Sequence, residues 1–478
     1  MDEITLSLSH ERGAIMYRFE LDYLKQWKTR TSRKPAVIRG ARQVGKSFLV
    51  RMFAEQEFSN LLEVNFERNP GVASLFELKS PKTIVSQLEA RFDVPVTPGK
   101  TLLFLDEIQA APEVLAVLRY FHEEMPELHV VCAGSLLEFV LEEHSFSMPV
   151  GRIEYLHMGP MRFEEFLLAM KRDRLRQWLC DYALDGSVPD EIHRELLRLL
   201  RQYLVVGGLP AAVSVFAQNQ SYRECEQVQQ SIIATYRDDF SKYASKVRHR
   251  RVEKVFAGIP RLVGRKFMYS QIDREERSRD MSEALRLLCL ARVAHQVRHT
   301  AANGLPLAAE ADDRHFKVLF MDVGLLCRSL GLSVAEIERP EDVLLINQGA
   351  LCEQFVGQHL AFSEFCYEEP ALYCWMRRER NSNAEVDFLM AVGPDVVPVE
   401  VKAGKTGTLK SMHLFVREKG RDFALRFNSD TPSLCHAHTS LSAGDQKPFS
   451  LLSLPLYLVG QARRLCREAM LNRNGPVR

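Results

Sequence analysis

This chain lacks most of the features that would assign it quickly to a specialised class of protein. No apolar run approaches the roughly 18–20 residues needed to span a bilayer, so we expect no membrane partner. The ten cysteines are scattered singly, without C-x-x-C pairs or zinc-ligand spacing, which argues against a disulfide framework or a zinc site. The net charge is only +1, so any contact with nucleic acid must be a local patch. The acidic start, Met1-Asp2-Glu3, lacks a signal-peptide pattern, and reduced thiols in a cytoplasm are expected.

What is present is an ordinary globular composition with no internal repeat and no low-complexity tract. Hydrophobic residues make up 46% of the chain and charged residues 26%, both typical of folded proteins. With 478 residues the chain is too long for a single core. We therefore expect about two to four domains.

The most informative motif is Gly-Ala-Arg-Gln-Val-Gly-Lys-Ser at residues 40–47. It lies between an apolar run at 36–38, a predicted strand, and a helical pattern from Ser47, which is the context that G-x-x-x-x-G-K-[ST] requires. The glycines let backbone N–H groups point at phosphate oxygens, and the helix N-terminus adds partial positive charge. The predicted nucleotide-binding residues are Gly40, Ala41, Arg42, Gln43, Val44, Gly45, Lys46 and Ser47. The alternative, a glycine-rich turn that binds nothing, is disfavoured because all four fixed letters are present.

Within this loop two side chains have predicted roles. Lys46 reaches the β- and γ-phosphates of ATP, and Ser47 offers its hydroxyl to Mg²⁺. We expect Lys46 on a solvent-accessible loop, so that Lys46→Ala loses ATP binding without unfolding.

A second motif is the apolar segment 101–107, which ends in Asp106-Glu107. Such a run is typical of a buried strand in a parallel sheet. We predict that Asp106 holds Mg²⁺ and that Glu107 orients or deprotonates the attacking water, which favours hydrolysis over phosphoryl transfer to a small molecule. The alternative is an acidic helix cap after a strand. A third strand, 128–133, leads to Ser135, which either hydrogen-bonds the γ-phosphate or the water, or caps the next helix.

Strand and helix patterns alternate between residues 34 and 160, which predicts a doubly wound parallel sheet with further strands at 61–66 and 153–158. The other predicted segments are a lead-in at 1–33, a mostly helical part at 161–240, a helical and winged-helix-like part at 241–335, and an α/β region at 336–478. The basic run 246–251 either touches nucleic-acid phosphates or is a solvated helix face.

The last region carries a third pattern. A predicted helix at 349–361 precedes three predicted strands at 372–376, 385–390 and 396–402. Because strand residues alternate faces, Asp387 can converge with Glu400 and Lys402 across a hairpin. Asp387, Glu400 and, from the helix, Glu353 are candidate Mg²⁺ ligands, and Lys402 can steady a water or a developing phosphate charge. This order is the pattern of the PD-(D/E)xK nuclease-like fold, and the alternative is acids and lysines alternating with valines on a half-exposed sheet.

With these motifs identified, the chain resembles a group of prokaryotic AAA+ superfamily ATPases that carry a C-terminal domain of unknown function related to restriction nucleases. The matching segments are 40–47, 103–109, 133–135, 151–152, 207–210, Glu353 with Phe355, 385–388 and 400–404. The resemblance implies an AAA-type P-loop core, a winged-helix middle and a restriction-nuclease-like α/β C-terminal domain. It also implies that Arg152 acts on the γ-phosphate as a sensor or arginine finger, unless Arg152 is a structural arginine that caps a helix or pairs with an acid.

Two functions follow from the sequence. The first is an ATP-binding, Mg²⁺-dependent ATPase whose nuclease-like domain binds or cleaves DNA. The second is a nucleotide-controlled switch whose C-terminal domain binds a partner without cutting. The near-neutral charge slightly favours the second, because nucleases usually present a basic groove. DNA, a partner protein and other copies of the chain are the candidate partners.

Overall fold

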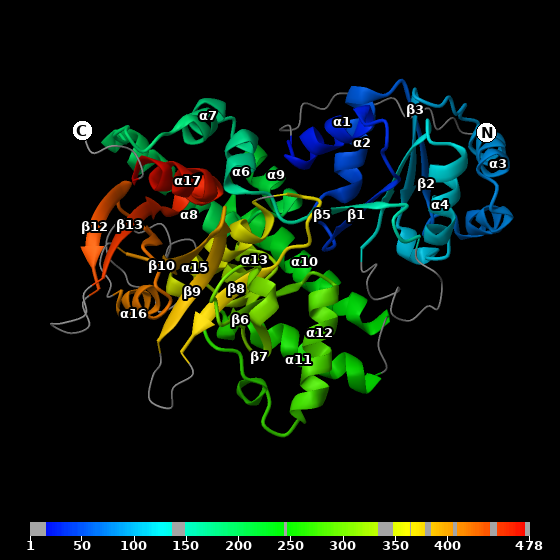
Figure 1. Ribbon diagram of the computed structural model, residues 1–478. Helices are drawn as coiled ribbons and strands as arrows, with labels where there is room; N and C mark the ends of the chain where they lie inside the picture. The colour runs from blue at the N-terminus through cyan, green and yellow to red at the C-terminus, as the bar shows by residue number, and fades with distance from the viewer. Residues whose placement is uncertain are drawn as a thin grey trace.

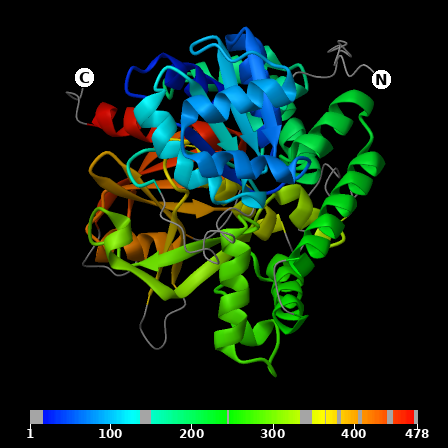
Figure 2. The ribbon, with the colours of Figure 1, turned by 90° about the vertical axis from the view of Figure 1, so that its right-hand side faces the viewer.

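The structure, a computed structural model, describes residues 16–135, 149–242, 246–332, 348–363, 365–377, 384–404, 409–439 and 447–473. It consists of two β-sheets with helices packed on and between them. Figure 1 shows the first sheet, in blue and cyan, at one end of the molecule and the second, mostly yellow and orange, toward the other. In Figure 2 a run of green helices follows one side, from the level of the first sheet to that of the second.

The first sheet has five parallel strands in the order β2-β3-β4-β1-β5. The strands are β1 (Ala36–Gly40), β2 (Asn60–Asn65), β3 (Thr101–Asp106), β4 (His129–Ala133) and β5 (Glu154–Met158). Each of the five predicted strands is present. β3 is buried along its whole length, because both faces of the sheet are covered. The predicted doubly wound parallel sheet is confirmed.

Alternate residues of these strands enter two separate cores. The covering helices are α1 (Glu20–Thr29), α2 (Lys46–Glu57), α3 (Pro81–Phe92) and α4 (Val114–Glu124), with the 3₁₀ helices η1 (Pro70–Leu78) and η2 (Ile108–Ala110). Ile38 packs with residues of α1 and α2, whereas its neighbour Val37 packs with residues of α3 and α4. The two-residue period of a strand thus places helices on both faces.

The middle of the chain is mostly helical, as predicted. Its elements are α6 (Phe163–Ala169), α7 (Asp173–Asp181), α8 (Asp190–Val206), α9 (Pro210–Asn219), α10 (Tyr222–Lys242), α11 (Lys246–Leu262), η3 (Tyr269–Gln271), α12 (Ser278–Leu290), η4 (Leu307–Glu310) and α13 (Val323–Ser329). No helix in the described ranges is long and apolar enough to cross a membrane.

The predicted break at 207–210 separates α8 from α9 and depends on Asp322. Gly207 has a positive φ of 76°, and a Cβ there would lie 2.2 Å from Asp322 Oδ1. Asp322 Oδ2 accepts a 2.7 Å hydrogen bond from Gly208 N, while Oδ1 caps α13 by accepting from Leu325 N at 3.0 Å. The glycine pair therefore allows a buried carboxylate to join two helical segments more than a hundred residues apart.

The second sheet has eight strands in the order β12-β13-β11-β10-β9-β8-β6-β7. The strands are β6 (Ala294–Thr300), β7 (Ala311–Phe320), β8 (Leu372–Met376), β9 (Glu385–Val392), β10 (Asp395–Val401), β11 (Phe423–Asn428), β12 (Ser433–His438) and β13 (Pro448–Pro455). They pack with α15 (Gln348–Phe362), α16 (Lys410–Glu418), η5 (Leu456–Gln461) and α17 (Ala462–Arg473). The predicted hairpin of β9 and β10 is present. β6 and β7 belong to this sheet although they precede residue 336, where the C-terminal α/β region was predicted to begin. The domain boundaries themselves stay predictions.

The segment from α11 to β7 contains α11, η3 and α12, followed by the antiparallel β6–β7 pair, and its assignment as winged-helix-like stays a prediction. Arginines of its basic run, residues 246–251, form ion pairs with acids of the same segment. Arg248 forms an ion pair with Glu283 at 2.5 Å, and Arg251 pairs with Glu276 at 2.8 Å and Asp280 at 2.9 Å. Because acids of the same segment already pair with Arg248 and Arg251, these contacts favour a solvated helix face over phosphate binding for residues 246–251.

Helix α15 packs on the second sheet and is hydrogen-bonded to the helices α6 and α8. His359 Nε2 accepts a 2.9 Å hydrogen bond from Phe163 N at the start of α6, and its Nδ1 lies 2.8 Å from Phe355 O. Gln358 Nε2 donates to the hydroxyl of Tyr203 in α8 at 3.1 Å. Burial lowers the pKa of His359 to about 3, so its ring is neutral at physiological pH.

This neutral histidine predicts a loss of stability in acid. In the unfolded chain His359 gains a proton near its ordinary pKa of 6.5, whereas the folded protein resists protonation. The contribution is therefore present above pH 6.5 and lost as pH falls toward 3. His359→Gln should reduce the fall in unfolding free energy between pH 7.5 and pH 5 by about 1–2 kcal/mol in urea titrations. His438→Gln, at an exposed position, is the control; an identical pH slope in both variants contradicts the prediction.

Candidate functional site

The predicted phosphate-binding loop connects β1, which ends at Gly40, to α2, which begins at Lys46. Gly45 has a φ of 95°, and a Cβ there would lie 3.2 Å from Pro210 Cγ, so glycine suits both the turn and its packing. Because α2 starts here, its first backbone N–H groups face the carboxyl edge of the sheet. The loop therefore has the strand-to-helix context that an anion site at a helix N-terminus requires.

Lys46 is placed differently from the prediction. Only 8% of the residue is exposed, and its Nζ donates to Gly40 O at 3.0 Å and to Ala41 O at 2.8 Å. The loop reaches solvent at Gln43, but the side chain of Lys46 does not, because its ammonium folds back onto carbonyl oxygens of its own loop. Phosphate oxygens would have to replace these carbonyls as acceptors.

Ser47 of the loop and Asp106 at the end of β3, the two predicted Mg²⁺ ligands of this site, lie together. Ser47 Oγ is 2.9 Å from Asp106 Oδ1 and 3.1 Å from Oδ2, and Asn65 Nδ2 donates to Oδ2 at 3.3 Å. Burial, and then the neighbouring Glu107 carboxylate, raise the pKa of Asp106. A hydroxyl and a carboxylate beside the loop are oxygen ligands of the kind that Mg²⁺ takes, so the residues fit the ion.

Glu107 and Ser135 are linked by a residue whose role the sequence did not reveal. Gln109 Nε2 donates to Glu107 Oε2 at 2.6 Å and to Glu67 Oε1 at 3.4 Å, while its Oε1 accepts from Ser135 N at 3.1 Å. The only signal was its place in the matching segment 103–109. The Ser135 hydroxyl is buried and has no hydrogen-bond partner among the described residues. The alternative that Ser135 caps the next helix falls on residues 136–148, outside the described part of the chain.

The loop is also held from outside the first sheet. The guanidinium of Arg42 bonds the carboxylate of Asp239 in α10, and Arg42 O accepts from the hydroxyl of Tyr236 at 2.7 Å. Arg18, buried beneath the loop, donates to Val44 O at 2.5 Å and pairs with Glu165 at 3.2 Å. Nothing local in the sequence indicates these contacts, because they join residues far apart in the chain.

Arg152 does not approach the loop of its own chain. It lies just before β5, which runs parallel to β1, so it sits at the edge of the sheet opposite the loop. Its Nε is 2.9 Å from Glu123 Oε1 at the end of α4. The prediction that Arg152 reaches the γ-phosphate is not met within this chain, and the acid-paired alternative describes it.

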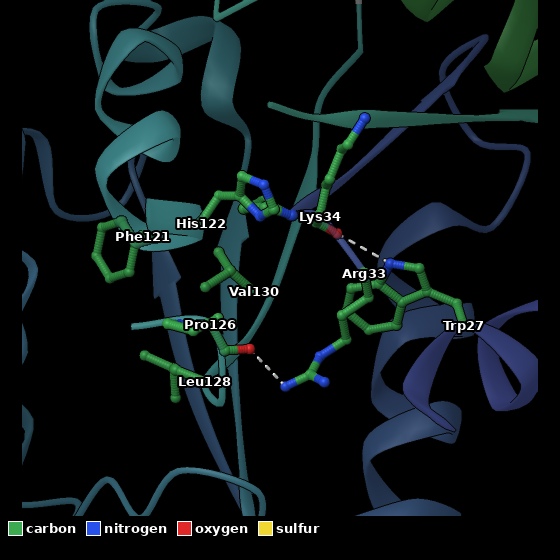
Figure 3. Close-up of a pocket in the computed structure, with 9 residues that line it drawn as sticks. Trp27, Arg33, Lys34, Phe121, His122, Pro126, Leu128 and Val130 are labelled. Carbon is green, nitrogen blue, oxygen red and sulfur yellow. Dashed lines mark hydrogen bonds between the residues drawn. The ribbon is translucent and has the colours of Figure 1, made fainter. Parts of the chain in front are cut away.

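A small pocket lies at this same opposite edge of the sheet (Figure 3). Trp27 Nε1 donates to Lys34 O at 2.9 Å on one side, and Arg33 donates to Pro126 O at 2.7 Å on the other. Lys34 precedes β1, whereas Gly40 ends it, so the length of the strand separates this pocket from the phosphate loop.

The predicted C-terminal cluster is only partly formed as expected. Asp387 Oδ2 accepts from Val401 N at 2.8 Å, which ties β9 to β10, and Lys402 Nζ lies 2.6 Å from Glu400 Oε1. The strands and the helix thus bring Glu353, Asp387, Glu400 and Lys402 to one region of the second sheet.

At the centre of this region is a cation that the sequence did not predict. Lys317 of β7 is completely buried, and its Nζ lies 2.5 Å from Glu353 Oε1, 2.7 Å from Glu385 Oε1 and 3.4 Å from Asp387 Oδ1. In the part of the chain that the structure describes, no group of three or more His, Cys, Asp or Glu is arranged to hold a metal. Glu353 and Asp387 thus lie around the Lys317 ammonium and Glu400 lies beside that of Lys402, and the Mg²⁺ site at these acids stays a prediction.

Burial shapes the charge of this cluster. It raises the pKa of Glu353 to about 7, against the opposing effect of Lys317, and the pKa of Glu400 to about 8, where the Asp387 carboxylate adds to it. Burial alone lowers the pKa of Lys317, but the carboxylates of Glu353, Asp387 and Glu385 outweigh it and raise that pKa well above its usual range. Lys317 thus keeps its proton, whereas two of the acids take one readily.

Comparison with family models assigns the first region. Residues 32–167 match a model described as an AAA domain, and they contain the loop, Asp106, Glu107 and Ser135. This region is an AAA-type P-loop ATPase domain. Residues 197–336 and 348–437 match two models described as domains of unknown function, DUF8612 and DUF4143. The comparison with curated proteins finds no match.

Several solved structures are similar in part. The ORC2 protein of Aeropyrum pernix is 13% identical, with 69% of this chain and 96% of that chain covered and a TM-score of 0.32. A RuvB variant of Thermotoga maritima is 14% identical, with 58% and 87% covered and a TM-score of 0.28. A STAND protein of Pyrococcus horikoshii is 11% identical, with 70% and 44% covered and a TM-score of 0.22. At TM-scores this low the likeness carries no conclusion about function.

The position of Lys46 predicts a specific effect of its removal. Lys46→Ala should abolish the heat of ATP binding in calorimetry, because a charge-assisted contact contributes about 1.5–3 kcal/mol for each phosphate bonded. The melting temperature should change little, since the hydrogen bonds that Lys46 Nζ donates to Gly40 O and Ala41 O join residues of one loop and hold no distant elements together. Lys82→Ala, an exposed lysine on α3, is the matched control. Wild-type ATP affinity in Lys46→Ala contradicts the assignment.

Proposed function

We propose that this protein is a Mg²⁺-dependent ATP hydrolase that works as a nucleotide-controlled switch, with a C-terminal region that binds a partner without cutting it. The observation that carries the proposal is the contact of the phosphate loop with two different parts of the chain. Ser47 bonds Asp106 within the AAA domain, and Arg42 bonds Asp239 outside it. The first contact places the two residues that would hold Mg²⁺ for hydrolysis. The second joins the loop to α10, so a change in the loop on nucleotide binding can alter the position of α10.

In this proposal the loop amides and Lys46 bind the phosphates, and Ser47 and Asp106 are the residues that would hold Mg²⁺. The ion, when bound, neutralises charge that develops on the phosphate oxygens. Glu107 orients or deprotonates the attacking water, and Gln109 holds its carboxylate at 2.6 Å. The buried hydroxyl of Ser135, which has no hydrogen-bond partner in the described part of the chain, supports a contact with the γ-phosphate or the water.

The switch has a continuous packed route to the second sheet. Tyr236 and Phe240 of α10 pack on Phe256 of α11, with ring centroids 6.5 Å and 5.3 Å apart. Phe256 in turn lies 5.3 Å from Phe320 at the end of β7. A phosphate that draws Arg42 away from Asp239 would change the anchoring of α10 at one end of this route.

Glu107→Gln tests both parts of the proposal. It should bind ATP normally but hydrolyse it about 10²–10⁴-fold more slowly, because the amide cannot accept a proton. With ATP trapped, hydrogen exchange in α10 should differ between the ATP and ADP states. Glu113→Gln, at an exposed position before α4, is the control and should hydrolyse at the wild-type rate. Unchanged hydrolysis in Glu107→Gln contradicts the hydrolytic role, and identical exchange in both states contradicts the switch.

The second candidate function is DNA cleavage by the C-terminal region. The convergence of Asp387, Glu400 and Lys402 on β9 and β10 favours it. The buried ammonium of Lys317 among the same acids weighs against it, because it takes the contacts that a metal would need.

Incubation of plasmid DNA with the protein, Mg²⁺ and ATP separates the two functions. We expect no nicking above the level of a Glu400→Ala, Lys402→Ala double variant. Cleavage by the wild type that disappears in the double variant would establish the nuclease instead.

A further inference from the structure

The buried ammonium of Lys317 is unusual in its surroundings. Three carboxylates from two different elements approach it, Glu353 from α15 and Glu385 and Asp387 from β9. Its Nζ also lies 5.5 Å from the centroid of the Phe388 ring. A charge removed from water is stable only when it is paired this closely, so the site is built around a cation.

The geometry that brings Lys317 here requires a curved sheet. β7 is separated from β9 by β6 and β8 in the strand order, yet their side chains meet at 2.7 Å. The sheet must therefore curl around the face that carries α15. Gly357 of α15 permits this, because a Cβ there would lie 2.3 Å from Leu319 of β7 and 2.8 Å from Phe388 of β9. One helix thus contacts both strands at once.

Each acid of the cluster has an ammonium partner without a metal. Glu353, Glu385 and Asp387 lie within 3.4 Å of the Lys317 ammonium, and Glu400 lies 2.6 Å from the Lys402 ammonium. A divalent cation at the same acids would lie close to the charge of Lys317 and be repelled by it.

We propose that the Lys317 ammonium is a permanent internal cation that stands where the nuclease-like arrangement would hold a divalent metal. The acids that would otherwise bind the metal serve instead to fasten β7 to α15 and β9. The cation comes from the segment before residue 336, so it locks the two regions of unknown function into one sheet. This inference deepens the proposed non-cutting C-terminal region and is independent of ATP hydrolysis.

Replacement of the ammonium by an added cation tests the proposal directly. In full-length protein without nucleotide, Lys317→Met should lower the melting temperature by about 5 °C or more, because it leaves buried carboxylates unpaired. MnCl₂ should recover part of this loss in Lys317→Met but not in Lys317→Met combined with Asp387→Asn. Lys317→Arg keeps the charge and should not respond to MnCl₂. Mn²⁺ can also bind beside the phosphate loop, so the change in melting temperature of Asp106→Asn on addition of MnCl₂ shows how much of the stabilisation comes from that site.

A second measurement needs no variant that folds poorly. Fe²⁺ with ascorbate and peroxide cuts a backbone beside bound iron, and in the wild type we expect no cut between residues 385 and 402. A cut there overturns the proposal, as does equal stabilisation of the wild type and Lys317→Met by MnCl₂, or no recovery of a folded Lys317→Met. If Lys317→Met does not fold, the map of the wild type decides alone. ATP hydrolysis on the same samples reports separately on the first domain.

Discussion

The nucleotide site depends on one constraint, which is that parallel strands finish at the same edge of their sheet. β1 ends at the phosphate loop, β3 ends at Asp106 and β4 leads to Ser135. Residues dozens of positions apart therefore reach hydrogen-bonding distance, as Ser47 and Asp106 do at 2.9 Å. The apolar runs of the central strands β1, β3 and β4 are buried under helices on both faces, and this burial holds their polar ends in place.

A second constraint is the position of α15 between the second sheet and the helices α6 and α8. Its polar side chains satisfy backbone and hydroxyl groups of α6 and α8, as His359 does for Phe163 N. Its opposite end carries Glu353 to the ammonium of Lys317. The same helix therefore links the AAA domain to the charged cluster of the second sheet. The side chains between the two ends are tightly packed. Such packing changes between discrete arrangements and does not deform continuously, so a rearrangement at one end would require the side chains along α15 to repack.

Local patterns were sufficient for much of the fold. All five strands of the first sheet and the hairpin of β9 and β10 could be predicted, because each depends on the apolar period of its own segment. The phosphate-binding loop at 40–47 could also be predicted, because the backbone N–H groups that would bind phosphate belong to consecutive residues. Lys46 shows where this reading stops: its identity was clear, but its burial on Gly40 O and Ala41 O depends on the folded loop.

The sequence by itself determined the kinds of chemistry present: a phosphate loop, an acidic strand end and alternating acids and lysines on later strands. Only the tertiary structure decided which of these groups meet. In the folded protein Gln109 is hydrogen-bonded to Glu107 and Ser135. Arg152 lies at the edge of its sheet opposite the phosphate loop. Lys317 lies among acids whose spacing in the sequence indicated a metal site. The physical reason is that periodicity assigns a residue to a face, whereas the curvature of a sheet and the approach of a helix determine its partner across that face.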